Sequence, residues 1–465
     1  MTAGAPRTIV DAAAALRRGE VTAAKLLETR LARADEVDDS VGVFVSRFDE
    51  QARAAAEALD AELADGRDRG PLHGIPIGVK DLLTTVEGPT TAQSVATDRK
   101  WRDQVDAPVV ARLRAAGGVI VGKTTLSEFA CGFPDPSKPF PIPRNPWDTA
   151  RWAGGSSGGS ASGVATGAVL GAVGTDTGGS VRIPAGFCGV TGLKTTIGLV
   201  PTAGCVPLAP TFDSVGPIAL TAEDCRVLFD VMRGESRLPS SEPAGVDVTR
   251  VRAGDLSGVR IGVDPLTASS AGIDPGQPES FEAAISAFAE AGATIVEAPL
   301  PQFAAVVAAN YAIMLSEALA YHLPALRTRW DDYGESTRTL LAGAAGYTGA
   351  DFAQALRVRW AVAPDLDELF GRVDVHMSPM ATITAPRLDE MAGEHLGRLF
   401  GSIHTPYWST VGYPALSVPV APAQNGLPLG VQIAAPPYAE DVALAVGAAF
   451  QTHTQWHLRE APCTC

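Results

Sequence analysis

The stretch from Gly154 to Ser180, GGSSGGSASGVATGAVLGAVGTDTGGS, is the feature that most constrains this chain. It holds two serine-bearing glycine turns separated by a segment made almost entirely of small residues. Glycines beside a serine let the backbone adopt left-handed angles and approach a ligand closely. Two such turns around one packed element can direct two hydroxyls at one point, and a nucleophile beside backbone N–H donors can attack a carbonyl. The stretch therefore predicts an acyl-transfer enzyme, with a hydrolase as the first interpretation.

Length, composition and charge narrow the class of protein. The chain has 465 residues, of which 46% are hydrophobic and 19% charged, as in soluble globular proteins with a large core. A net charge of −15 argues against a nucleic-acid partner, because phosphate binding needs clustered Lys and Arg. The same charge disfavours an anionic membrane surface. No run of about 20 strongly apolar residues is apparent, and Val164–Gly174 comes closest.

The two ends of the chain and its cysteines bear on the compartment. The N-terminal segment is charged and amphipathic, unlike a signal peptide. Six scattered cysteines do not form a disulfide framework in a chain of this length. Cys463 and Cys465 form a C-x-C pattern able to bind a soft metal, although such an end is more often a disordered tail. We expect a cytoplasmic protein without disulfides.

Apolar periodicity predicts alternating helices and strands. Helical spacing covers 8–35, 49–65, 109–116, 278–291 and about 303–370, and Thr125–Ala130 is expected to begin another helix. Thr221–Met232 is a further helix, with Thr221 as N-cap and Asp224 completing a capping box. The predicted strands are 75–79, 119–121, 258–264, 294–297, 373–378, 413–420 and 429–434. This rhythm indicates a sheet with helices on both faces, a proline-rich loop at Pro134–Pro146 and a surface connection at 234–257.

Two short motifs suggest other functions. Gly154–Gly158 satisfies G-x-S-x-G, the nucleophile elbow of α/β-hydrolases, but the preceding residues 148–153 make a poor strand and no HGGG segment is present. Gly117–Thr124 matches the phosphate-binding pattern G-x-x-x-x-G-K-[ST], but its apolar residues 119–121 themselves read as a strand. Both matches are therefore weaker hypotheses than the paired serine turns.

Lys80 is a candidate general base. It follows the apolar segment 75–79, which would carry its ammonium into the interior and lower its pKa. A neutral amine near a serine can accept its proton, as in Ser–Lys catalytic systems. An ion pair with the adjacent Asp81 is an equally good interpretation. The seven histidines are dispersed, and the His453 and His457 pair lacks the glutamate of a zinc motif, so neither a zinc site nor a Ser-His-Asp triad is favoured.

Taken together, these elements resemble the amidase signature family. The resemblance is carried by GGSSGGSASGVATG and GTDTGGSVRIPAGFCGVTGLK, with GIPIGVKD, GKTTLSEFA, RNPWDTA, DSVGPIA, GYPALSVPV and GLPLGVQI around them, and it runs from about residue 8 to 458. It implies a single large α/β/α domain over residues 1–465 with a central mixed β-sheet covered by helices. The catalytic core would span about 70–232, a helical region at about 278–370 would shape the substrate pocket, and a tail would begin at about 459. No metal or organic cofactor is implied.

The resemblance also assigns catalytic roles. It implies Ser180 as nucleophile, Ser156 as a bridging serine after a cis peptide bond from Gly155, and Lys80 as base. The oxyanion hole would comprise the N–H groups of the four residues Thr177, Gly178, Gly179 and Ser180. Asp176 and Arg182 would brace this loop, and Ser157 would assist by hydrogen bonding.

Substrate and partners are less constrained. The expected activity is hydrolysis of a small-molecule amide, with carbamate, urea-type or ester cleavage as alternatives and a homodimer as a common assembly in this family. Some members are components of glutamine-dependent amidotransferases, whose signature usually continues S-I-R-Q-P, whereas this chain has S-V-R-I-P at 180–184. The segment 401–405 also lacks an acidic residue to hold a glutamine amino group. Both departures favour a free-standing hydrolase. We expect the pocket walls to come from Pro134–Pro143, 303–345 and Met380–Pro386, narrowed by Trp152.

Overall fold

A computed structural model describes residues 5–98, 105–234, 246–266, 273–391 and 395–462, so Cys463 and Cys465 lie outside the described residues. Within them one sheet has eleven strands in the order β1-β3-β2-β6-β8-β7-β12-β13-β11-β9-β10. These strands are β1 (Phe44–Arg47), β2 (Pro76–Lys80), β3 (Val119–Thr124), β6 (Gly171–Asp176), β7 (Thr191–Lys194), β8 (Ser214–Ala219), β9 (Arg260–Val263), β10 (Thr294–Glu297), β11 (Val375–Pro379), β12 (Ala415–Pro419) and β13 (Gly430–Ala434). The sheet is mixed: β3, β2 and β6 run parallel, as do β11, β9 and β10, and the strands between them pair antiparallel.

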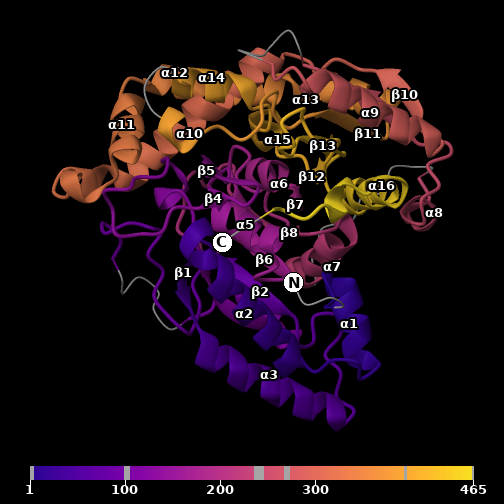
Figure 1. Cartoon of the computed structure of the whole chain (residues 1–465). Coiled ribbons are helices and arrows are strands. Elements are labelled where there is room, and N and C mark those ends of the chain that lie inside the picture. The colour runs from indigo at the N-terminus through magenta and orange to yellow at the C-terminus, as the bar shows by residue number, and fades with distance from the viewer. Residues whose placement is uncertain (1–4, 99–104, 235–245, 267–272, 392–394, 463–465) are drawn as a thin grey trace.

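Helices surround this sheet (Figure 1). They are α1 (Ile9–Arg17), α2 (Ala23–Val41), α3 (Asp49–Ala64), α4 (Pro108–Ala115), α5 (Gly158–Thr166), α6 (Arg182–Cys188), α7 (Ala222–Arg233), α8 (Val248–Arg252), α9 (Gln277–Glu290), α10 (Phe303–Leu326), α11 (Glu335–Ala344), α12 (Gly349–Ala361), α13 (Ala363–Arg372), α14 (His395–Ser402), α15 (Pro406–Val411) and α16 (Glu440–His453). A mixed sheet flanked by helices is the predicted fold class.

The two faces of strand β6 show how the layers are built. A Cβ on Gly174 would meet the Ser157 side chain at the start of α5, whereas a Cβ on Gly171 would meet Leu228 of α7. Residues three apart in a strand point to opposite faces, so α5 and α7 cover opposite sides of β6. The small residues of the signature stretch thus let a helix lie close to the sheet and bring its first turn to the carboxyl end of β6.

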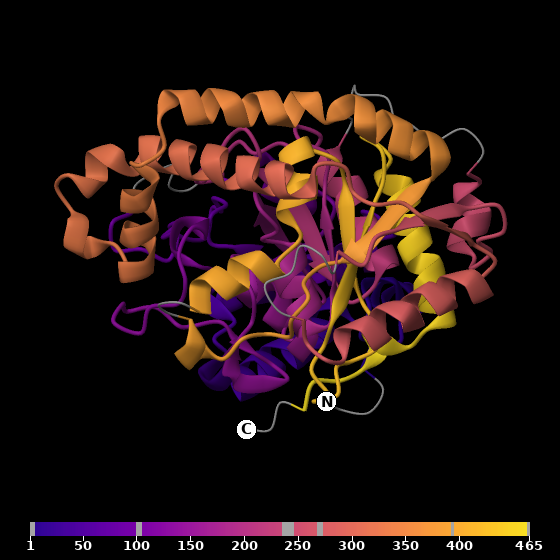
Figure 2. The ribbon, with the colours of Figure 1, turned by 90° about the horizontal axis from the view of Figure 1, so that it is seen from above.

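The C-terminal half adds a helical layer beside the carboxyl end of β6. Helices α10 to α13 follow β10, and α10 packs against α11, α12 and α15 (Figures 1 and 2). Helix α10 has 24 residues and contains an 18-residue window with a mean hydropathy of 1.6, so by length and composition alone it is apolar enough to cross a membrane. This corrects the expectation that no such run exists. In the structure it is one wall of the helical layer.

Local corrections have physical causes. The helix expected from Thr125 is only a 3₁₀ turn, Glu128–Ala130, because Phe129 and Ala130 adopt positive φ angles of 51° and 60°. Thr221 caps α7 as predicted, but the Asp224 carboxylate does not close a capping box, since it accepts the Val10 N–H at the start of α1 (3.0 Å). The surface connection at 234–257 contains α8, and residues 235–245 of it lie outside the described ranges.

Candidate active site

Lys80 ends β2 with its side chain fully buried. Its Nζ lies 2.7 Å from Ser156 Oγ, 2.9 Å from Ser157 Oγ and 2.8 Å from Thr175 Oγ1. Within the part of the chain that the structure describes, no carboxylate forms an ion pair with it. Burial lowers the pKa of Lys80 to about 7, because an ammonium surrounded by neutral hydroxyls is poorly solvated.

The hydrogen bonds around Lys80 are compatible with a neutral amine that accepts a proton from Ser156. Ser157 Oγ donates to the Thr175 carbonyl at 3.2 Å, so it accepts from Lys80. In the neutral form two N–H groups would serve Ser157 and Thr175 and the lone pair would face Ser156, whereas an ammonium would donate to all three hydroxyls. The alternative interpretation of Lys80 as a partner of Asp81 does not hold, since Asp81 pairs with Lys123, Nζ to Oδ1 3.4 Å.

Ser156 lies at the turn before α5. The peptide bond between Gly155 and Ser156 is cis, the geometry that the resemblance implies. Glycine is required at 155, because a Cβ there would lie 2.5 Å from Trp152 Cζ2. The segment before this turn, β5 (Asp148–Trp152), pairs with β4 (Arg144–Asn145) in a separate two-stranded sheet and forms an isolated bridge to Arg387, outside the eleven-stranded sheet. A nucleophile elbow follows a strand of the main sheet, so that interpretation fails here.

The second serine turn, residues 177–180, has all its carbonyls anchored. Thr177 O accepts from Asn310 Nδ2 (3.3 Å), Gly178 O from Thr405 Oγ1 (2.8 Å) and Gly179 O from the Ile183 N–H (2.7 Å). Ser180 O accepts the Ser157 N–H at 3.1 Å, which joins the two serine turns. The loop is therefore held rigidly in spite of its glycines.

The N–H groups of this turn divide into two kinds. The Gly179 N–H donates to Asp176 Oδ1 at 2.8 Å, so the structure directs this member of the predicted oxyanion hole into the protein instead. No acceptor for the N–H groups of Gly178 and Ser180 occurs among the described residues, and both residues are partly exposed in the cavity. An oxyanion site built on Gly178 and Ser180 fits this arrangement best, with the Thr177 N–H as the remaining predicted member.

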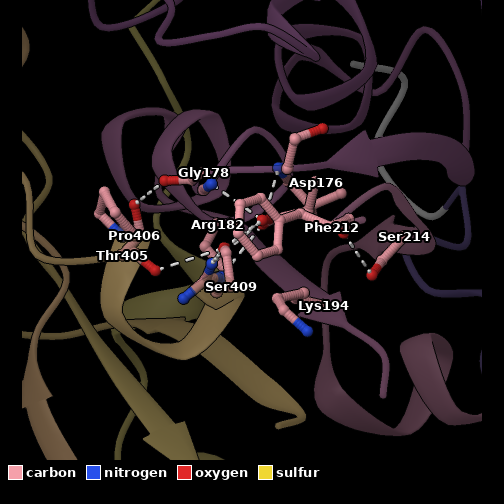
Figure 3. Close-up of polar contacts among 12 residues, drawn as sticks. Asp176, Gly178, Arg182, Lys194, Phe212, Ser214, Thr405, Pro406 and Ser409 are labelled. Atoms are coloured by element: carbon pink, nitrogen blue, oxygen red, sulfur yellow. Dashed lines mark hydrogen bonds and ion pairs between the residues drawn. The ribbon is translucent and has the colours of Figure 1, made fainter. Parts of the chain in front are cut away.

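Asp176 and Arg182 form the bracing network expected from the sequence (Figure 3). The fully buried Asp176 accepts from the N–H groups of Gly179 and Val181, from Arg182 Nε and Nη2 (both 3.0 Å) and from Ser409 Oγ (3.1 Å). Burial acts to raise the pKa of Asp176, but the Arg182 guanidinium outweighs it and holds that pKa below its usual value. Asp176 is therefore an acceptor that fixes the loop.

Sequence reasoning missed the side chains that complete this network from far along the chain. Arg182 donates to Gln432 Oε1 (2.8 Å) and to Ser409 Oγ (2.7 Å), and Thr405 reaches Gly178. Gln432 belongs to β13 and Ser409 to α15. Both fall inside or beside the late segments that resemble the family, but no spacing in the sequence connects them with the serine turns.

A cavity of about 90 Å³ opens in front of both serines. Its backbone and hydroxyl lining comes from Ser127, Gly155, Ser156, Gly178 and Ser180. Its walls are Ala130, Cys131, Gly132, Phe133, Trp152, Ile183, Leu208, Tyr311, Met314, Leu399, Phe400 and Ile403. None of these lining residues carries a charge, so the cavity favours an apolar, uncharged group.

The origin of these walls differs in part from the expectation. Helix α10, within the expected 303–345 region, provides Tyr311 and Met314, and Trp152 does line the cavity. The loop Pro134–Pro143 and the turn Met380–Pro386 do not line it, whereas α14, which was not anticipated, contributes Leu399 and Phe400.

The phosphate-binding interpretation of Gly117–Thr124 fails on geometry. Its residues from Val119 onward form the buried strand β3, so they cannot curl around a phosphate. Lys123 is fully buried and donates to Asp81, to the Leu83 carbonyl and to Thr90 Oγ1. His453 and His457, four residues apart, do not share one helix face, because His453 ends α16 and His457 lies in the 3₁₀ turn Trp456–Leu458.

Comparisons with known proteins give a consistent result. A family model described as Amidase matches residues 25–444. The chain is 36% identical to the A subunit of glutamyl-tRNA(Gln) amidotransferase from Chloroflexus aggregans over 477 residues, covering 97% of each chain. Among solved structures, a chain from a complex bearing on the origins of an s-triazine catabolic enzyme matches with a TM-score of 0.86 and 31% identity, covering 98% of this chain and 100% of that one. Peptide amidase from Stenotrophomonas maltophilia matches with a TM-score of 0.80 and 27% identity, over 96% and 97%.

Proposed function

This chain belongs to the amidase family, and on that premise we propose that it hydrolyses the carbon–nitrogen bond of a small, uncharged, largely apolar carboxylic amide. The observation that carries the proposal is the buried Lys80, whose Nζ lies within hydrogen-bonding distance of Ser156 Oγ and of two further hydroxyls and forms no ion pair among the described residues. This arrangement supplies a base of suitable pKa next to the serine turns.

The proposed reaction uses Ser180 as nucleophile. Its Oγ attacks the substrate carbonyl while its proton passes to Ser156 and the Ser156 proton passes to neutral Lys80. The N–H groups of Gly178 and Ser180 stabilise the oxyanion, each such donor being worth about 3–4 kcal/mol. The proton then returns through Ser156 to the departing amine, which leaves an ester on Ser180. Water hydrolyses this acyl-enzyme by the same relay and releases the acid.

The polarity of the cavity supports the substrate class. A charged group in an apolar cavity loses its hydration without gaining a partner, which costs several kcal/mol. Glutamine carries both an ammonium and a carboxylate, and the described lining residues offer neither group a counter-charge. An aliphatic or aryl amide fits these walls better. Carbamates and esters remain alternatives, because the same machinery accepts any acyl carbon.

The amidotransferase alternative is favoured by one specific observation, the 36% identity to an amidotransferase component over almost the whole chain. On that alternative this chain would act as a glutaminase within a complex. Assaying the purified chain alone against glutamine and against a series of uncharged amides separates the two functions. Glutaminase activity that exceeds hydrolysis of every uncharged amide, carbamate and ester tested would overturn our proposal.

The mechanism is tested by labelling with a serine-directed fluorophosphonate and locating the adduct by mass spectrometry. We expect an adduct on Ser180 in the wild type, no adduct there in Ser180→Ala, and much slower labelling in Lys80→Ala. An adduct on Ser156 that forms equally fast without Lys80 would contradict the proposed relay. A matched hydrolysis assay with an uncharged amide should lose activity in the same two variants.

A further inference from the structure

We propose that Thr405 is a positioning residue, whose hydroxyl orients the N–H donors of Gly178 and Ser180 toward the oxyanion. This proposal rests on the proposed function, in which those two groups stabilise the tetrahedral intermediate. Thr405 lies at the N-cap position of α15, far along the chain from the signature stretch that contains both serine turns. It acts through the glycine loop and does not line the cavity.

The contact is close and buried. Thr405 is fully buried, and its Oγ1 donates to the Gly178 carbonyl at 2.8 Å (Figure 3). A Cβ built on Gly179 would lie only 1.9 Å from that Oγ1, so the hydroxyl lies directly against the Gly178–Gly179 segment. Gly179 adopts φ +130°, which an L side chain rarely does. Glycine at 179 and threonine at 405 therefore fit each other.

Thr405 fixes one end of a peptide whose other end is already held. In a trans peptide the C=O and N–H point in opposite directions. The Gly178 carbonyl accepts from Thr405, and the Gly179 N–H of the same peptide donates to Asp176. With both ends bound, this peptide cannot rotate, and the peptides on either side of it carry the N–H groups of Gly178 and Ser180, two residues that line the cavity.

Without the Thr405 hydroxyl the loop would lose this constraint. Two successive glycines have more accessible backbone conformations than any other pair, so an unanchored Gly178–Gly179 peptide would sample other orientations. A misplacement of about 1 Å at a reacting group costs on the order of 10²-fold in rate. Because the donors contact the transition state more strongly than the substrate, the loss should appear in kcat and not in KM.

Helix α15 also supplies a matched control. Thr410 is fully buried like Thr405, and its Oγ1 donates to the carbonyls of Pro406 (2.7 Å) and Val306 (3.2 Å). Neither acceptor belongs to the loop at 176–180. Thr410→Val removes a buried threonine hydroxyl from the same region as Thr405→Val, so the two variants should lose comparable stability while differing in their effect on Ser180.

The experiment compares wild type, Thr405→Val, Thr405→Ser and Thr410→Val by the rate of fluorophosphonate labelling of Ser180 and by kcat and KM for an uncharged amide. We expect Thr405→Val to lower the labelling rate and kcat about 10–100-fold with KM changed less than about twofold, and Thr405→Ser to restore most of both. Thr410→Val should label at the wild-type rate. If Thr405→Val does not fold by circular dichroism, Thr405→Ala takes its place with the same expectation.

Two results would overturn the proposal alone: wild-type labelling in folded Thr405→Val or Thr405→Ala, or a slowing in Thr410→Val as large as theirs. A wild type whose Ser180 does not react would instead overturn the proposed function and this inference with it. The two failures are therefore distinguishable in one set of samples.

Discussion

Lys80 and Lys123 occupy neighbouring strands, are both fully buried, and have opposite kinds of surroundings. In the parallel pairing of β2 and β3, Val79 lies opposite Lys123 and Lys80 opposite Thr124. Lys123 Nζ has a carboxylate, a carbonyl and a hydroxyl as partners, whereas Lys80 Nζ has three hydroxyls. A lysine paired with a carboxylate contributes to the fold, and a lysine among hydroxyls can give up its proton and accept another.

The difference follows from where each strand ends. Lys80 is the last residue of β2, so its side chain reaches the serine turns that start α5 and follow β6. Lys123 contacts Asp81 and the segment 83–90, which cover the same end of the sheet from the other side. Lys80 and Lys123 are therefore offset by one residue in the pairing of β2 and β3. This offset gives Lys80 the surroundings of a proposed base and Lys123 those of a structural ion pair.

The largest expected effect on catalysis comes from replacing Lys80. Lys80→Met should lower the rate of Ser180 labelling and of amide hydrolysis by about 10²–10⁴-fold, the usual contribution of a positioned general base. Methionine keeps the volume and removes the amine. The measurement is the second-order labelling rate at pH 8 on protein whose fold is verified by circular dichroism. Labelling within twofold of wild type would remove Lys80 from the mechanism.

The same substitution at Lys123 should lower the stability of the fold and leave catalysis nearly unchanged. Lys123→Met leaves Asp81 buried without its cation, which costs about 3–5 kcal/mol in the free energy of unfolding. The fraction that remains folded should label at nearly the wild-type rate. Denaturant unfolding monitored by fluorescence measures the first quantity and labelling of the folded fraction the second. A Lys123→Met variant that is as stable as wild type but does not label at Ser180 would contradict the assignment of Lys123 to a structural role and Lys80 to a catalytic one.

The pH dependence should follow Lys80. Burial lowers the pKa of Lys80 to about 7, and only the neutral amine accepts a proton, so activity is lost as pH falls. The labelling rate should decrease about tenfold per pH unit below pH 7 and reach a plateau above it. In Lys80→Met the small residual rate should lack this dependence. A wild-type profile that is flat from pH 5 to 8 would show that Lys80 does not titrate there.

The sequence predicted the polar centre of the site better than its walls. Glycines and serines around 154–180 and the apolar strand before Lys80 are local patterns with a definite chemical reason, and the structure brings Lys80, Ser156 and Ser157 within hydrogen-bonding distance. Thr405, Ser409 and Gln432 act through contacts that span more than 220 residues, so no local pattern marks them. The apolar walls from α14 could not be predicted because any apolar residue suits such a position.

The failed helix after Thr125 shows a similar limit. Its sequence has acceptable helical propensity, but tertiary hydrogen bonds override it. Ser127 donates its N–H to the Ser156 carbonyl, and Glu128 accepts from Ser94 and from the Gly334 N–H. These contacts hold the segment against the cavity in a conformation that a helix would not allow. Propensity is reliable here only where no distant partner competes for the backbone.

The smallest effect on catalysis should come from a third buried lysine, Lys194. Burial, with the nearby charge of Arg182, lowers its pKa to about 7 as well. Among the described residues, however, its Nζ donates to the Thr195 carbonyl alone (2.7 Å), and Lys194 does not line the cavity. Lys194→Met should therefore change the labelling rate by less than about tenfold. If Lys194→Met slows labelling as much as Lys80→Met does, burial and a lowered pKa would be enough to give a lysine a catalytic role without hydroxyl partners. The contrast drawn between Lys80 and the structural lysines would then be wrong.

The pH dependence of unfolding tests whether Lys194 is neutral in the folded protein. Lys194 loses its proton at about pH 7 when folded and at about 10.5 when unfolded, so the unfolded chain binds more protons between these values and stability rises with pH there. The cost of burying the ammonium is complete below pH 7 and disappears above about 10.5. Relative to wild type, Lys194→Met should thus be more stabilised at pH 6 than at pH 9 in denaturant unfolding. An equal difference at both values would mean that Lys194 keeps its proton in the folded state, and that burial without hydroxyl partners does not produce a neutral lysine in this fold.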